Sequence, residues 1–530
     1  MSANIPLQLQ TVFKYVDSHK TAYIETLKEA VAFQSVSIDP NKREECIKIM
    51  RWTEKCFRKV GAETELCDIG KEEIPGGKTI KRLPVLIALF GKKSGNKKTV
   101  CIYGHMDVVS AKKEDGWITD PFILTEKDGK LFGRGASDNK GPILCWLHAI
   151  EAFQANKIEL PVNVKFIVEC MEEVGSVGLE NFMLSKKKTF FNDVDYLCIS
   201  DSSWLYPKKP SISYGTRGIV YFSVEVEGPK RDLHSGTYGG LVQEPMSDLI
   251  FLLNSLQDHN GKIQVPGLHD FVVSVTPEEE RLYEDIALDI EELRNHCGVY
   301  RLAHKEDKVR LLMHNWRFPS LSYHGIEGAY SGSGGKTVIP AKVSGKVSLR
   351  LVQHQTPERI TEKVQEYLQQ VFKLRKSSNV LRVQLLASSK TWSENPLTPH
   401  YQVFGGTPGK SFRYTGVNLP RPPQALRAAI PQLLGTDLRR RRSSLAGLGF
   451  QAAMRAVKYV YKAEPDLTRE GRSIPVCNML KDVTDGKSLL LLPICKTDDC
   501  QHTSNEKIDL KSYIDGIKVM AGYIYEVSLL

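Results

Sequence analysis

The chain has 530 residues and a mass of 59.6 kDa, which predicts two domains. Apolar residues make up 41% of the chain and charged residues 25%, a balance that excludes an intrinsically disordered protein. No stretch approaches the ~18 consecutive apolar residues that cross a bilayer, and residues 1–20 lack the apolar region of a secretory signal. Eleven dispersed cysteines without a C-x-x-C pair indicate reduced thiols. We therefore expect a soluble cytoplasmic protein that does not bind membranes.

The net charge of +10 is concentrated in one segment. Residues 402–450 hold eight Lys or Arg and one acid, which leaves a charge of +3 for the other 481 residues. Because the excess charge is local, nucleic-acid binding is not favoured for the protein as a whole. The same segment has five prolines and seven glycines, which predicts a loop or insertion. An RNA-, membrane- or partner-binding arm at residues 439–442 stays open as the alternative.

Apolar runs in the first half of the chain alternate with helical patterns, which is typical of an α/β sheet. Strands are predicted at 99–103, 162–168 and 194–199, and a further strand much later at 488–493. Between the first two strands, the apolar residues of 141–153 predict a buried helix. These elements predict an α/β domain.

The pattern changes after residue 211, where half-exposed strands and amphipathic helices begin. The predicted elements are strands at 220–226, 343–352 and 380–386 and helices at 246–256 and 357–374. This mixture predicts a small α+β domain inserted into the larger one. We place the inserted domain at 213–386 and the α/β domain at 1–212 and 387–530.

Polar side chains follow each strand of the predicted α/β domain, at the point where the strand ends. The residues at these positions are His105, Asp107, Glu172, Glu173, Asp201 and His502, and Asp138 lies in the loop before the buried helix. In an open α/β sheet, ligands bind outside the carboxyl ends of the strands, so we expect these side chains at one rim.

Imidazoles and carboxylates together are ligands that suit Zn, Mn or Co. One carboxylate that bridges two ions ~3.5–4 Å apart would make a two-metal hydrolytic site. Such a site also needs a separate general base, and the adjacent Glu172 and Glu173 offer one ligand and one base. Each residue alone is more often structural, but their shared position on strand ends favours a metal site.

Several motifs resemble the M20 family of di-metal peptidases, in its carnosine dipeptidase branch. They are Tyr103-Gly-His-Met-Asp107, the loop of residues 133–141 (GRGASDNKG), Met171-Glu-Glu-Val-Gly-Ser176, Ser200-Asp201 and Asp232-Leu-His-Ser-Gly236. The resemblance covers nearly the whole chain except 402–450. It implies a catalytic α/β di-metal domain at 1–212 and 387–530, with an inserted α+β lid and dimerisation domain at 213–386.

The resemblance implies two divalent metal ions per subunit, Zn or Mn. His105 and Asp201 would bind one ion, and Glu173 and His502 the other. Asp138 would bridge the two ions.

The resemblance also implies roles for residues that bind no metal. Glu172 would be the general base, and Asp107 would orient His105. His234 would reach into the active site of a partner subunit and stabilise the oxyanion, which makes the homodimer part of the mechanism. The substrate-binding residues would be Thr337, Arg350 and Ser473, with Arg350 as a fork for the C-terminal carboxylate.

The implied reaction is hydrolysis of unblocked dipeptides, such as Cys-Gly and carnosine-like substrates. Deacylation of N-acyl amino acids and carboxypeptidase activity are alternatives within the same family. Arg472 stands where the family has a glycine, and a side chain there costs energy if the position needs a positive φ. Cys500 and Gln501 stand before His502, where the family usually has small residues. The alternative outside enzymes is a binding protein that has lost catalytic activity through Arg472 and binds its partner through the Arg-rich segment.

Overall fold

The computed structural model describes residues 5–74, 77–91, 97–394 and 448–530. The predicted basic loop at 402–450 lies outside the described residues up to residue 447. Within the described part of the chain, no helix has both the length and the apolar character needed to cross a membrane. All eleven cysteines are free, as their dispersed positions predict.

The chain forms two compact units. The first comprises Met1–Tyr214, Glu394–Pro465 and Leu480–Leu530, and the second comprises Gly215–Ser393 and Asp466–Met479. Strand β11 (Ser211–Thr216) and helix α15 (Val476–Val483) contain points where the chain passes from one unit to the other.

Among the described residues, the first unit has helices both before and after the second unit in the sequence. They are α1 (Leu7–Ser18), α2 (Lys20–Ala32), α3 (Arg43–Lys59), α4 (Lys140–Ala155), α5 (Leu179–Ser185), α14 (Leu448–Tyr461) and α16 (Leu510–Val527). Its strands are β1 (Glu63–Cys67), β2 (Lys71–Ile74), β3 (Lys78–Lys81), β4 (Val85–Phe90), β5 (Thr99–His105), β6 (Thr125–Lys127), β7 (Lys130–Phe132), β8 (Asn163–Glu169), β9 (Tyr196–Ile199), β10 (Ser203–Trp204), β20 (Ser488–Leu491), β21 (Cys495–Lys496) and β22 (Lys507–Asp509).

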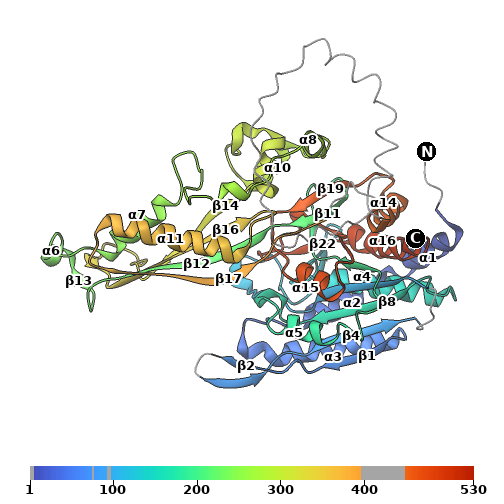
Figure 1. Ribbon diagram of the computed structural model, residues 1–530. Coiled ribbons are helices and arrows are strands. Elements are labelled where there is room, and N and C mark those ends of the chain that lie inside the picture. Colours follow the sequence, from blue (N-terminus) through green and yellow to red (C-terminus); the bar gives the residue numbers. More distant parts are fainter. Residues whose placement is uncertain (1–4, 75–76, 92–96, 395–447) are drawn as a thin grey trace, which may run out of the picture. The chain divides into compact units, whose positions relative to one another are not determined.

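The first unit is built on a mixed sheet with the order β1-β4-β8-β5-β9-β20-β11. Strands β8, β5, β9 and β20 run parallel to one another, whereas β1, β4 and β11 are antiparallel to their neighbours. The four parallel strands confirm the four strands predicted from apolar runs, and α4 confirms the predicted buried helix. The α/β class is therefore confirmed (Figure 1).

The central strands are rich in apolar residues because both faces of the sheet are covered. Strands β5 and β8 are buried along their whole length. Helix α4 packs against β5 and α16, and it approaches the end of β5 very closely. A Cβ at Gly104 would lie 2.1 Å from Cδ1 of Ile143, so only glycine fits there. This close approach places the next residue, His105, beside the loop that precedes α4.

The second unit combines helices of 4 to 19 residues with a four-stranded antiparallel sheet. Its strands are β12 (Gly218–Glu227), β13 (Leu233–His234), β14 (Ser320–Glu327), β15 (Val338–Ile339), β16 (Lys342–Leu351), β17 (Val380–Ser389), β18 (Trp392–Ser393) and β19 (Asp466–Glu470). Its helices are α6 (Ser235–Tyr238), α7 (Pro245–Ser255), α8 (Pro277–Glu284), α9 (Ile290–Cys297), α10 (Lys308–Trp316) and α11 (Pro357–Arg375).

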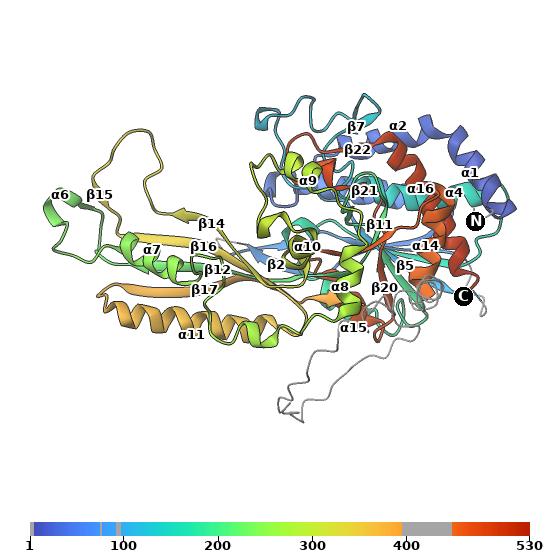
Figure 2. The ribbon, with the colours of Figure 1, turned by 90° about the horizontal axis from the view of Figure 1, so that it is seen from above.

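The core of the second unit lies between one antiparallel sheet and two helices. The sheet has the order β14-β16-β12-β17, and α7 and α11 pack side by side against it (Figures 1 and 2). Alternate residues of β12, such as Phe222 and Val224, point into this core with Leu252 and Val364 of the helices. The strands and helices predicted at 220–226, 246–256, 343–352, 357–374 and 380–386 are all present.

Candidate metal centre

The ends of the parallel strands bring the predicted ligands together. His105 is the last residue of β5, which lies between β8 and β9 in the sheet. After β8, the chain turns into the 3-10 helix Glu172–Val174, which begins with the two adjacent glutamates. Asp201 follows β9 after one residue. Because the strands are parallel, their carboxyl ends meet at one edge of the sheet, as predicted.

The His105 imidazole lies among buried carboxylates. Its Nε2 is 3.3 Å from Asp138 Oδ1 and 3.4 Å from Asp201 Oδ2. Glu172 Oε2 lies slightly farther away, at 4.0 Å from the same nitrogen. This nitrogen is buried and has no hydrogen-bond partner among the described residues.

Asp138 lies between two imidazoles and turns one oxygen to each. Its Oδ1 faces His105, and its Oδ2 is 3.1 Å from Nε2 of His502. The same His502 nitrogen is 2.9 Å from Glu173 Oε2. The site therefore divides into a His105 side with Asp201 and a His502 side with Glu173, and Asp138 is common to both.

Asp107 orients the residues around it. Nδ1 of His105 lies 3.1 Å from the carbonyl oxygen of Asp107 and 3.4 Å from its Oδ1. The backbone N–H groups of Glu172 and Glu173 donate to the two carboxylate oxygens of Asp107, at 3.2 and 3.1 Å. One buried carboxylate thus fixes both the imidazole of His105 and the backbone of the glutamate pair.

The carboxylates shift the pKa values of one another and of the two histidines. Burial raises the pKa of Glu172 well above its usual range, and the neighbouring carboxylates act in the same direction. Burial also raises the pKa of Glu173. Hydrogen bonds to Asp138 and Glu173 raise the pKa of His502 to about 10. Burial opposes the charge of Asp138, but the two imidazoles beside it, His105 and His502, hold its pKa well below the usual range. The site therefore favours positive charge.

The residues present fit divalent cations. His105, Glu172 and Asp201 place one ligand atom each within 4.8 Å of one another, and so do His105, Asp138 and Glu173. The unpaired Nε2 of His105 faces these carboxylates, an arrangement that a cation between them would satisfy. Mixed nitrogen and oxygen donors without thiolates suit Zn or Mn.

The predicted site residues of the second unit form two pairs. His234 is exposed, and its Nε2 lies 3.3 Å from the hydroxyl of Thr337. Strands β13 and β15 hold this pair together, with His234 opposite Val338. Elsewhere in the unit, Nη1 of Arg350 donates to the hydroxyl of Ser473 at 2.9 Å.

Arg472 adjoins this second pair without straining the backbone. It is not among the described residues with a positive φ, so the expected conformational cost does not arise. Its Nε lies 3.6 Å from Oε2 of Glu470, and its carbonyl oxygen accepts from the N–H of Arg217 at 3.0 Å. Burial lowers the pKa of Arg350, and the neighbouring Arg472 charge adds to this effect.

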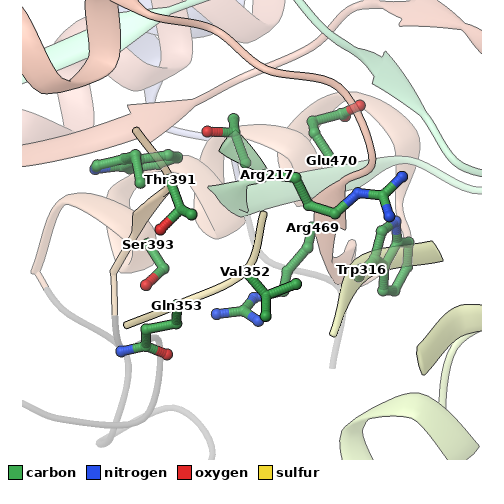
Figure 3. Close-up of a pocket in the computed structure, with 10 residues that line it drawn as sticks. Arg217, Trp316, Val352, Gln353, Thr391, Ser393, Arg469 and Glu470 are labelled. Carbon is green, nitrogen blue, oxygen red and sulfur yellow. The ribbon is translucent and has the colours of Figure 1, made fainter. Parts of the chain in front are cut away.

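A small polar pocket lies within the second unit and is lined by Arg217, Trp316, Thr391, Arg469, Glu470 and neighbouring residues (Figure 3). Arg217 donates to the carbonyl oxygen of Gly471 and to the hydroxyl of Ser320. Burial lowers the pKa of Arg217 to about 9, and the charge of Arg350 acts in the same direction. None of the predicted site residues lines this pocket.

Comparison with known proteins decides the family. Residues 101–526 match the family described as "Peptidase family M20/M25/M40". The chain belongs to the M20 peptidase family. This M20 peptidase is 41% identical to the Beta-Ala-His dipeptidase of Rattus norvegicus, over 98% of the chain and 96% of that protein. It is 38% identical to the Cys-Gly metallodipeptidase dug1 of Schizosaccharomyces pombe, over 98% of the chain and 99% of that protein.

The solved structures agree with this assignment. The crystal structure of human carnosine dipeptidase 1 has 40% sequence identity and a TM-score of 0.84, over 99% of this chain and 100% of that one. The resemblance to M20 peptidases, the α/β fold that it implies and the hydrolase class are therefore confirmed.

Two buried carboxylates near the site were missed by the sequence analysis. Glu169 accepts hydrogen bonds from the hydroxyls of Tyr103 and Ser176, at 2.6 and 2.7 Å, and burial raises its pKa to about 7. Glu506 accepts hydrogen bonds from the loop that carries Asp138. The sequence offered little indication of either residue, because an isolated glutamate matches no motif. The hydrogen-bond donors to Glu506, such as Ser137 and Asp138, lie more than 300 residues earlier in the chain.

Proposed function

We propose that this M20 peptidase hydrolyses the peptide bond of unblocked dipeptides by means of a metal-activated water. The observation that carries the proposal is Asp138, which turns one carboxylate oxygen to His105 and the other to His502. The similarity to dipeptidases over nearly their full length supports the substrate class and does not favour the deacylase or carboxypeptidase alternatives.

We propose two divalent ions, Zn or Mn, in each subunit. His105 and Asp201 would hold one ion, Glu173 and His502 would hold the other, and Asp138 would contribute to both. Bound divalent ions would supply Lewis acidity, which activates water and polarises a substrate carbonyl. The division of the site into a His105 side and a His502 side supports this assignment.

Glu172 is the general base in this proposal. Its side chain lies 4.0 Å from His105 Nε2 and is the farthest of the three carboxylates from that nitrogen. A carboxylate at this distance is free to take a proton from the attacking water and pass it to the leaving amine. Asp107 holds His105 and the Glu172 backbone in place.

The first unit is the catalytic domain in this account, and the second unit is a lid and dimerisation domain. His234 from the partner subunit stabilises the developing oxyanion, so the enzyme works as a homodimer. Arg350 and Ser473 bind the C-terminal carboxylate, and Thr337 contacts the substrate beside His234. The existing Arg350–Ser473 hydrogen bond supports this assignment because it prepares the guanidinium for a carboxylate. Eleven free cysteines fit a cytoplasmic location.

A comparison of two substrates tests the reaction class. Cys-Gly and an N-acetyl amino acid are assayed side by side with the Mn²⁺-loaded protein. Because the proposal requires a free dipeptide, kcat/KM for Cys-Gly should exceed that for the acylated substrate by at least ~100-fold. Faster turnover of the N-acetyl amino acid would replace the dipeptidase proposal with a deacylase.

A further inference from the structure

Glu506 links the two loops that carry Asp138 and His502. It lies four residues after His502 and is completely buried. Its Oε1 accepts hydrogen bonds from the backbone N–H of Ser137 and Asp138, both at 3.0 Å, and from the Ser137 hydroxyl at 2.9 Å. The backbone N–H of Asp138, the proposed bridging residue, therefore donates to a carboxylate from the loop that carries His502.

Arg134 completes this link from the opposite direction. Its Nη1 donates to Oε2 of Glu506 at 2.7 Å, and the backbone N–H of Gly135 donates to the same oxygen at 3.1 Å. Nη2 of Arg134 donates to the carbonyl oxygen of Thr503, next to His502, at 3.0 Å. Arg134 is only 2% exposed, and its guanidinium carbon lies over the Trp117 ring, 5.2 Å from the ring centroid.

An ion pair this deeply buried is an inefficient way to gain stability. Removing both charges from water costs free energy that their attraction only partly offsets, so apolar residues often stabilise a fold as well or better. A buried carboxylate with five hydrogen bonds does, however, define the position of each donor tightly. All five donors belong to residues 134–138, in the loop that carries Asp138.

We propose that Glu506 and Arg134 are positioning residues that fix Asp138 relative to His502 and thereby set the affinity for the metal ion between them. The inference rests on the metal assignments of the proposed function. Metal ligands must lie within a few tenths of an ångström of their ideal positions, and the groups that orient them typically change metal affinity by ~10–100-fold. Neither residue touches the substrate or the reacting atoms in this account.

The substitution Glu506→Gln tests the inference because it keeps the shape of the side chain and replaces one of its two acceptor oxygens by an NH₂ donor. The amide nitrogen would face N–H donors of residues 134–138, so the loop must shift. Metal affinity is measured by competition between the protein and a chromophoric chelator for Mn²⁺ and for Zn²⁺. We expect ~10–100-fold weaker binding of one of the two ions. Saturating metal should restore most of kcat, with KM for Cys-Gly unchanged.

Glu526→Gln is the matched control in the same unit. Glu526 is equally buried, and it pairs with Arg455 and Tyr459 between helices α14 and α16. Its substitution should lower thermal stability without weakening metal binding. Equal metal affinities for the wild type, Glu506→Gln and Glu526→Gln would reduce the Arg134–Glu506 pair to a structural role and overturn the inference.

A milder substitution covers the case in which Glu506→Gln does not fold. Ser137→Ala removes only the hydroxyl bond to Glu506 Oε1. We expect metal binding a few-fold weaker than in the wild type, and unchanged affinity would contradict the inference. The two proposals fail separately. Wild-type protein that binds no pair of metal ions would refute the proposed function, whereas normal wild-type metal binding and turnover with an unaltered variant would refute this inference alone.

Discussion

Glu172→Gln should lower kcat for Cys-Gly hydrolysis by about 10³-fold while the protein keeps both metal ions. The reason is that glutamine cannot accept the proton of the attacking water, although it has nearly the shape of glutamate. Burial and neighbouring carboxylates raise the pKa of Glu172, a shift expected of a proton acceptor that must later return its proton. Steady-state kinetics and metal analysis of the purified variant measure both quantities.

The adjacent Glu173 provides the control for this substitution. Its carboxylate lies 2.9 Å from His502 Nε2, so Glu173→Gln should weaken metal binding as well as turnover. The two neighbouring glutamates are thereby distinguished as base and ligand. A near-wild-type rate for Glu172→Gln, or loss of its metal ions, would contradict its assignment as the base.

Because the proposed function assigns His234 as an oxyanion donor in a homodimer, His234→Ala should reduce kcat by ~10²–10³-fold without changing the oligomeric state. His234 is exposed on its own unit and held beside Thr337, a position suited to a residue that acts in another subunit. His259→Ala, at another exposed histidine of the second unit, is the control and should leave kcat unchanged. Activity and sedimentation of each variant are measured together.

Mixed dimers reveal whether the site is shared. A heterodimer of His234→Ala and Glu172→Gln chains has one site with both residues intact and one site with neither. After subunit exchange, the mixture should regain about a quarter of wild-type activity, because half of the dimers are mixed and each has one working site. A mixture that contains heterodimers but stays inactive would show that His234 does not act across the dimer.

The sequence predicted the four parallel strands of the first unit because their apolar runs are buried on both faces. It ended the first strand at Tyr103, whereas β5 continues to His105, since a buried histidine interrupts the apolar pattern without ending the strand. The meeting of His105, the glutamate pair and Asp201 at one edge of the sheet could be predicted from parallel topology. Individual roles depended on the resemblance to M20 peptidases.

The contacts between distant segments could not be predicted. Glu506 and Arg134 are separated by 372 residues, and neither has a local pattern that reveals the other. Likewise, Asp466–Met479 belongs to the second unit although it lies well beyond the rest of that unit in the sequence. Periodicity reports the environment of an element but does not identify its remote partner.

Removal and return of metal ions in a hydrolysis assay test whether the protein is a metal-dependent dipeptidase. The rate of Cys-Gly hydrolysis is measured for the purified protein, then after removal of metal ions by a chelator, and again after addition of Mn²⁺ or Zn²⁺. We expect activity to disappear with chelation and to return with the metal. Protein that binds two metal ions without hydrolysing Cys-Gly, or hydrolysis that persists after complete metal removal, would contradict the proposed function.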